Sequence, residues 1–242
     1  MTDLEKRRDY FATTRWTVVL TAARTDTTRA RKALAELCQV YWYPLYAYAR
    51  RRGHSVHDAE DLTQGFFAHL LQQDFLAGLS QEKGRFRAFL LASMNHYMAD
   101  EWDRVSAQKR EAKKTLSLEA ETAEHRYQTE LAEQWTPERV FERQWAMILL
   151  ETTVQRLARE YETAGRGALF TEIQFAILGE RSAVPYTELA ARLNLSHEAV
   201  RVAVHRLRQR YRRILREEIA HTVTGETDIL EELNYLRQVL AS

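Results

Sequence analysis

A run of arginines between Arg201 and Arg216 has the residue types and the spacing to contact DNA. The run holds seven arginines and no acidic residue. On a helix, spacings of four, three and four would place four of its side chains on one exposed stripe: Arg201, His205, Arg208 and Arg212. Arginine presents two parallel N–H donors that match guanine in the major groove. Three flanking side chains could reach phosphates: Arg206, Arg210 and Arg213. A solvated basic face is the alternative, but a run without a single acid favours DNA.

The segment before this stripe has the pattern of a helix-turn-helix. Leu189 and Leu193 are spaced as the buried face of a short helix, and Asn194 tolerates the left-handed backbone of a turn. Ser196 is suited to cap the next helix, whose buried face is expected at Val200, Val204, Leu207, Tyr211 and Ile214. A helix-turn-helix lays its second helix in a major groove, so the two patterns predict the same DNA contact.

A second group of polar residues would form one face of an earlier helix. Ser55 is suited to cap that helix, and its buried stripe is expected at Ala59, Leu62, Phe66 and Leu70. Asp58, Asp61 and Gln64 fall opposite the stripe. An acidic face suits a basic partner. The alternative is that Asp58 only complements the helix dipole and that the other two are solvated.

A third group lies on a helix expected from about residue 85 to beyond residue 102, next to a basic block. The block, 104–114, holds five bases against Glu111 alone. Single-stranded nucleic acid needs stacking platforms with cations nearby, and the candidates are Asn95, His96, Trp102, Arg104, Lys109 and Arg110. Trp102 could instead belong to the core, as aromatic residues at helical spacing usually do.

These groups together resemble bacterial sigma factors. Tyr186 to Leu215 resembles the fourth conserved region, which recognises the promoter −35 element. Asp58-Ala-Glu-Asp-Leu-Thr-Gln-Gly-Phe-Phe67 resembles the second conserved region, whose helix docks on the clamp helices of the RNA polymerase β′ subunit, although Gly65 stands where the family usually has an acidic residue. Gly84 to Leu90, continued by Asn95, Asp100 and Arg104, resembles the part that melts and captures the −10 element. The order and separation of the two modules resemble those of extracytoplasmic-function (ECF) sigma factors, and the resemblance covers about 30–105 and 137–216. Thr14-Arg15-Trp16 resembles a subgroup of that family with an added N-terminal segment and C-terminal tail.

The resemblance implies a sigma factor without catalytic activity or cofactor. Its partners would be core RNA polymerase, contacted through the acidic face around Asp61, promoter DNA, and in some settings an anti-sigma factor. Two rival hypotheses stay open: a helix-turn-helix regulator that acts without polymerase, and a helical adaptor that binds no DNA. No metal is expected, because His54, His57, Asp58 and Asp61 lack a ligand spacing such as His-Glu-x-x-His.

The composition predicts that helices position all of these residues. Eight glycines and three prolines among 242 residues are too few for a turn-rich β protein. The single cysteine, Cys38, forbids an internal disulfide and suits a reducing compartment. No apolar run is long enough to span a membrane and no secretory signal is found, so a cytoplasmic protein is expected.

The order of patterns predicts an all-α chain of two helical domains joined by an acidic linker. The expected N-terminal helical bundle is 1–110, with one helix over about 28–52 that Pro44 kinks and Gly53 ends. The expected linker is 111–135, although Ser117–Ala132 could hold a helix, and the helix-turn-helix domain is 136–221. The acidic tail, 222–242, would form an amphipathic helix that either covers the DNA-binding face as an autoinhibitor or completes the C-terminal core.

Overall fold

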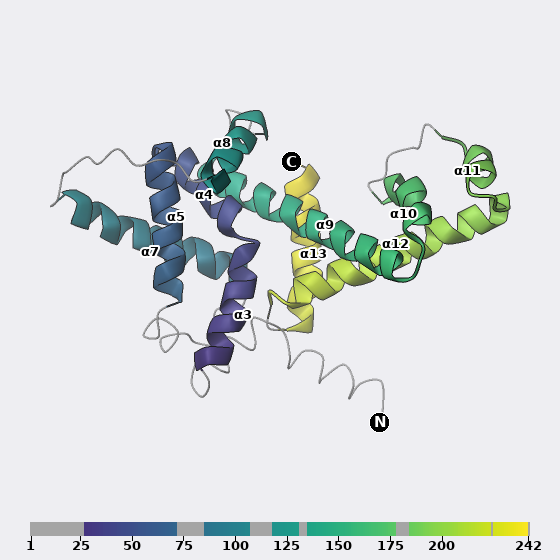
Figure 1. Cartoon of the computed structure of the whole chain (residues 1–242). Coiled ribbons are helices and arrows are strands. Elements are labelled where there is room, and N and C mark those ends of the chain that lie inside the picture. Colours follow the sequence, from purple (N-terminus) through teal and green to yellow (C-terminus); the bar gives the residue numbers. More distant parts are fainter. Residues whose placement is uncertain are drawn as a thin grey trace, which may run out of the picture. The chain divides into compact units, whose positions relative to one another are not determined.

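The chain forms helices wherever the computed structural model describes it, which is over residues 27–71, 85–106, 118–130, 135–177, 184–223 and 225–241 (Figure 1). The helices of its first part are α3 (Thr27–Gln39), α4 (Trp42–Arg51), α5 (Val56–Leu70), α7 (Phe86–Ser106) and α8 (Leu118–Glu130). Those of its second part are α9 (Pro137–Thr163), α10 (Gly167–Ile173), the 3-10 helix η1 (Gln174–Ala176), α11 (Tyr186–Arg192), α12 (His197–Ala220) and α13 (Glu226–Ala241). Extended pairing in these ranges is limited to one isolated bridge, Arg85 with Val223. The all-α prediction is confirmed.

The chain divides into two compact units. Unit 1 is Met1–Ile148 together with Ile219–Ser242, and unit 2 is Leu149–Glu218. The two units begin and end at other residues than the expected domains, whose boundaries are 110, 135 and 221. The functions expected for those domains stay predictions. Among the described residues, no helix is both long and apolar enough to cross a membrane.

The start of unit 1 differs from the single helix expected over 28–52. The chain forms two helices, and α4 begins two residues before Pro44. A proline near the start of a helix is tolerated, whereas in its interior it removes a backbone hydrogen bond and clashes with the preceding turn. The break before α4 therefore has a local cause. Gly53, at φ 94°, ends α4 as predicted, and the Ser55 hydroxyl accepts a hydrogen bond from Asp58 N at 3.1 Å, so the predicted cap of α5 is confirmed.

The core of unit 1 is aromatic and joins segments far apart in the sequence. The largest fully buried side chains are Tyr41, Tyr46, Tyr48, Phe66, Phe86 and Phe141. The Tyr41 ring meets Phe86 edge-on, with the ring centroids 5.1 Å apart, and stacks on Phe141 of α9 at 6.4 Å. The first half of α9 thus belongs to the core around α4 and α7, because it supplies an aromatic ring to it.

Part of the expected acidic linker packs on this core as α8. The Glu124 carboxylate accepts hydrogen bonds from Arg50 Nε at 2.8 Å and Nη2 at 2.9 Å, and from the Tyr46 hydroxyl at 2.8 Å. The Arg126 guanidinium lies over the Tyr43 ring, 4.5 Å from its centroid. Residues 118–130 are therefore a docked helix.

We expect Glu124→Ala to lower the free energy of unfolding of unit 1 by about 1–2 kcal/mol at pH 7, because it removes a two-pronged, charge-assisted contact that is only partly exposed. Arg50 holds the pKa of the Glu124 carboxyl below its usual value of 4.5. The carboxylate therefore stabilises the fold above pH 4.5, and this contribution disappears as the pH falls through the lowered, folded-state pKa. Urea unfolding at several pH values should show the difference from wild type shrinking in acid.

Glu121→Ala is the matched control, because Glu121 is an exposed acid on the same helix. An equal loss of stability in both variants, or a difference that persists unchanged in acid, would contradict the assigned role of the Arg50–Glu124 contact.

The tail helix α13 belongs to unit 1 and packs against the start of α7. Neither expectation for the tail, as an autoinhibitor of the DNA-binding face or as part of the C-terminal core, included this arrangement. Phe86 N donates to Thr222 O at 2.9 Å, next to the Arg85–Val223 bridge. Arg87 Nε donates to Glu232 Oε1 at 2.6 Å, and these side chains are 9% and 1% exposed. The start of α7 and the described tail are thus joined by backbone and by a buried ion pair.

Two aromatic rings and a second acid surround this ion pair. The Arg87 guanidinium lies 4.0 Å from the centroid of the Tyr235 ring and 5.2 Å from that of Trp145 on α9. Glu142 lies 3.6 Å from Arg87 Nη1. Because α7, α9 and α13 each contribute, Arg87 is a junction of three helices.

Unit 2 combines the second half of α9 with α10, η1, α11 and α12. Its core cluster is Leu157, Phe170, Ile173, Ala176, Leu189, Ala190, Val200, Val204, Leu207 and Ile214. Asn194 has φ 51°, and the Ser196 hydroxyl accepts from Ala199 N at 3.1 Å. The predicted turn at Asn194 and the predicted cap of α12 are both confirmed.

Candidate nucleic-acid interface and docking face

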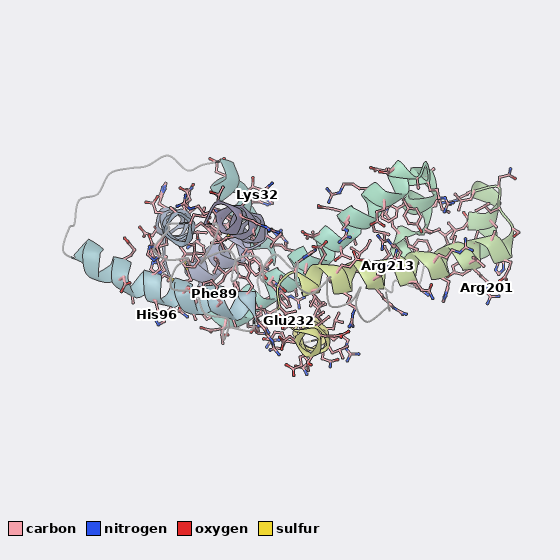
Figure 2. The ribbon with its side chains drawn as sticks, turned by 90° about the horizontal axis from the view of Figure 1, so that it is seen from below. Lys32, Phe89, His96, Arg201, Arg213 and Glu232 are labelled. Atoms are coloured by element: carbon pink, nitrogen blue, oxygen red, sulfur yellow. The ribbon has the colours of Figure 1, made fainter. Side chains whose placement is uncertain are left out.

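The four residues of the arginine stripe all lie on α12 and are all exposed: Arg201, His205, Arg208 and Arg212. The Arg201 side chain, labelled in Figure 2, is 60% exposed and pairs with Glu198 one turn earlier at 3.2 Å. An ion pair this exposed contributes little to stability. Arg201 can therefore exchange Glu198 for another acceptor at small cost.

Arg208 differs from its neighbours on the stripe because it has a backbone partner. Its Nε donates to the carbonyl oxygen of Ala176, the last residue of η1, at 2.9 Å. The bond uses one of the five N–H donors of the guanidinium. Arg208 thus holds the end of η1 against α12, in addition to any contact it makes with a ligand.

The three flanking arginines fall into two environments. Arg206 is exposed, and Arg213 is 65% exposed with Glu217 at 3.9 Å from its Nε (Figure 2). Arg210 is only 24% exposed and forms a double hydrogen bond with Glu160 of α9. Arg210 also holds the pKa of the Glu160 carboxyl below its usual value. Its main contact is thus within unit 2, and a phosphate contact would require this pair to open.

Two acids near the end of α12 form ion pairs with Arg156, a residue that the sequence analysis did not identify. Arg156 on α9 donates to Glu218 at 2.8 Å and forms a second hydrogen bond with Glu217. These partners lie about 60 residues apart along the chain, so no local pattern pairs them. The acids that follow the arginine run are therefore neutralised on the side of α12 that faces α9.

The candidates for single-stranded DNA are only partly described. Asn95 is half-buried, and its Oδ1 accepts from the Tyr48 hydroxyl at 2.6 Å and from Arg52 Nη1 at 3.1 Å. His96 is exposed on the neighbouring position of α7 (Figure 2). Trp102 and Arg104 belong to α7, but their side chains lie outside the described residues, as do Lys109, Arg110 and the segment Thr14-Arg15-Trp16. Asn95 is thus tied to α4, whereas His96 is available to a ligand.

The polar face of α5 is present as expected. Asp58, Asp61 and Gln64 are all exposed. Asp58 accepts from the Ser55 hydroxyl at 2.6 Å, and Gln64 Nε2 donates to Glu60 at 2.9 Å. Asp58 thus takes part in capping α5, whereas Asp61 lies about one turn further along, in the middle of the face.

A pocket of about 290 Å³ opens beside this face. Its lining residues come from α5, α7 and the turn before α5: His54, Asp58, Asp61, Leu62, Tyr97, Met98 and Glu101. Partial burial lowers the pKa of His54 below 6.5, although Asp58 acts in the opposite direction. This shift favours the neutral form of the His54 imidazole in the pocket.

The absence of an acidic side chain at position 65 has a packing cause. A Cβ atom built on Gly65 would lie 2.4 Å from the Tyr97 hydroxyl oxygen. The Tyr97 ring is held between Phe66 and His69, with ring centroids 5.8 Å and 5.7 Å away. Any side chain at position 65 would displace this ring. The close approach of α5 to α7 therefore excludes an acidic side chain at this position of the polar face.

The described residues include no group of three or more His, Cys, Asp or Glu placed to hold a metal ion. His54, Asp58 and Asp61 share the pocket without forming such a group.

The fold and these surfaces define an all-helical protein with an exposed cationic helix and a separate acidic face, as a nucleic-acid-binding protein with a protein partner would have. Residues 41–108 match the family Sigma-70 region 2. The match covers α4, α5 and α7, which carry Asp58, Asp61, Gln64, Asn95 and His96. It supports a sigma factor of the sigma-70 family. Comparisons with curated proteins and with solved structures gave no match.

Proposed function

We propose that this chain is an ECF-type sigma factor, which binds core RNA polymerase and directs promoter recognition, DNA melting and the start of transcription. The observation that carries the proposal is the match of residues 41–108 to sigma-70 region 2, because this segment includes α5, whose acidic face is the docking surface that the resemblance implies. The exposed cations of α12, outside the match, supply a second surface of the expected kind. The role is positional and needs neither a catalytic group nor a cofactor.

The docking step rests on charge complementarity between α5 and a basic partner surface. Asp58, Asp61 and Gln64 would meet the clamp helices of the β′ subunit, with Asp61 at the centre of the contact. Such complementarity mainly speeds encounter and fixes the register of the complex. The loss of an acid at Gly65 is offset by Glu101, which lines the pocket next to Asp61.

The DNA steps are divided between the two units. In unit 2, α11 and α12 would act as a helix-turn-helix that reads the −35 duplex through Arg201, His205 and Arg212. Phosphate contacts are assigned to Arg206 and Arg213, which are both exposed. In unit 1, α7 and the basic block after it would hold the opened −10 strand by stacking and by charge. A cytoplasmic location and control by an anti-sigma factor belong to the same proposal.

The test is retention of core RNA polymerase by the full chain, followed by run-off transcription from a promoter library. We expect stable association and promoter-dependent transcripts, and we expect Asp61→Arg to weaken the association at least tenfold, because it sets a positive charge against a basic surface. Glu162→Arg, which makes the same exchange at an exposed position of α9, should bind as wild type does.

A regulator that binds DNA without polymerase is the second candidate, and it is favoured by the position of α12 outside the matched segment. Such a protein would bind duplex DNA equally well with Asp61→Arg and would not be retained by core polymerase. A helical adaptor would show neither activity. The same two assays therefore separate all three functions.

A further inference from the structure

Val202 is an apolar side chain exposed in the middle of the cationic surface of α12. The described part of the chain has three exposed large hydrophobic residues, Leu195, Val202 and Leu230, and two of them lie at the turn before α12 or in its first two turns. The Val202 side chain is 38% exposed, whereas Val200 is fully buried. Sequence reasoning overlooked Val202 because the arginine spacing drew the stripe through other positions.

Helix geometry places Val202 nearer to the centre of the exposed face than the predicted stripe. At 3.6 residues per turn, Val202 projects about 160° away from the buried Val200, and Arg201 and Arg208 project only about 80–100° away. The bond from Arg208 to the Ala176 carbonyl agrees with this flanking position. The ridge of α12 farthest from its core therefore carries Val202, with His205 and Arg206 beside it at i+3 and i+4.

The surroundings of Val202 select the kind of ligand it meets. Its exposed neighbours one turn along α12, His205 and Arg206, are polar or cationic, so the apolar area that Val202 offers there is small for a protein interface. A major groove presents an equally small apolar target among phosphates and polar base edges, which is the C5-methyl group of thymine. Branching at Cβ keeps χ1 of valine stiff, so the two methyl groups are held in place before binding.

We propose that Val202 reads a thymine methyl group in the duplex that α12 binds, and that it is a specificity-determining residue. The inference rests on the proposed function, because it takes α12 to enter a major groove. Within that frame, Arg201 and His205 supply hydrogen bonds along one side of Val202, and Val202 supplies discrimination of thymine from cytosine through apolar contact.

The experiment removes the same contact from both partners. Each thymine of the −35 duplex found by transcription is replaced singly by uracil, which lacks only the methyl group, and binding of the full chain in its polymerase complex is measured by fluorescence anisotropy. For wild type, we expect one position at which uracil weakens binding about fourfold, the effect of one buried methyl group. With Val202→Ala, thymine and uracil at that position should bind equally well.

Arg206→Ala is the matched control on the same helix. It should weaken binding to all duplexes alike and keep the preference for thymine, because a phosphate contact carries no base information. Thermal unfolding of each variant should match wild type, since both side chains are exposed.

A thymine effect that survives Val202→Ala, or the lack of any position sensitive to uracil, would overturn the assignment of Val202 while leaving promoter binding intact. Failure of the wild-type complex to bind any specific duplex would overturn the proposed function, and the role of Val202 with it.

Discussion

Glu232→Ala should lower the free energy of unfolding of unit 1 by about 3 kcal/mol. Removing one member of a buried ion pair leaves the other charge without compensation, which costs about 3–5 kcal/mol. The Glu232 side chain is 1% exposed and Arg87 9% exposed, so water cannot replace the lost carboxylate. We expect the lower end of that range because Glu142, 3.6 Å from Arg87, remains as a second acid. The measurements are urea unfolding and amide hydrogen exchange of α13.

Two further variants separate the ion pair from the general effect of altering α13. Glu231→Ala removes an acid that is 57% exposed and pairs with Arg85 at the surface, so it should cost less than about 1 kcal/mol. The double variant Arg87→Met with Glu232→Leu exchanges the pair for an apolar contact and should recover most of the stability. Equal losses in Glu231→Ala and Glu232→Ala would refute the role of the buried pair.

Replacing Arg201 and Arg212 together by alanine should weaken binding to the −35 duplex by at least about 30-fold, and by more than about 10,000-fold if each arginine contributes at the upper limit. A base-contacting arginine contributes about 1–3 kcal/mol, and contributions from well-separated positions add approximately. The two residues lie three turns apart on α12, and Arg201 has only the exposed Glu198 as its ion-pair partner. Anisotropy titrations at two salt concentrations would measure the loss and its salt dependence.

Arg159→Ala is the control for the loss of positive charge, because Arg159 is an exposed arginine on α9 that contacts only the Gln155 carbonyl of its own helix. It should leave binding nearly unchanged. A loss in the double variant that is uniform across unrelated sequences, with a shallower salt dependence, would reassign Arg201 and Arg212 to the phosphates.

The local part of the fold was predictable because its causes are local. The scarcity of glycine and proline predicted helices, and Ser55, Asn194 and Ser196 each act within four residues of their own position. A kink at Pro44 was predicted within one helix, whereas the chain forms two helices that are interrupted before Pro44, between Gln39 and Trp42. Local rules specify that a proline disturbs a helix, but the burial of Tyr41 between Phe86 and Phe141 decides how the chain continues.

The packing of α8 and α13 could not be predicted, because the residues that hold them are far apart in the sequence. Arg50 and Glu124 are 74 positions apart, and Arg87 and Glu232 are 145 apart. An acidic helix in isolation is equally compatible with a linker, an autoinhibitor or a core element. The pairing partner decides between them, and periodicity carries no information about it.

The candidate site shows the same division. Helical spacing brought Arg201, His205, Arg208 and Arg212 to the exposed face of one helix, and it also identified the acidic face of α5 opposite the apolar stripe. Spacing could not show that Arg210 pairs with Glu160, or that one N–H of Arg208 donates to the Ala176 carbonyl oxygen. The arginine spacing also left Val202 out of the predicted stripe, although the predicted buried face around Val200 already places Val202 on the opposite side of the helix.

Unit 1 is discontinuous, since its last part, 219–242, follows the whole of unit 2. During synthesis on the ribosome, the Arg87–Glu232 ion pair can therefore form only after the whole of unit 2 has emerged. An early stop codon anywhere in unit 2 would release a chain whose first unit lacks its closing helix and exposes the apolar surface that α13 covers, a form that chaperones and proteases recognise. If the proposed function holds, degradation of such truncated chains would remove fragments that carry the acidic face of α5 but lack a complete unit 2.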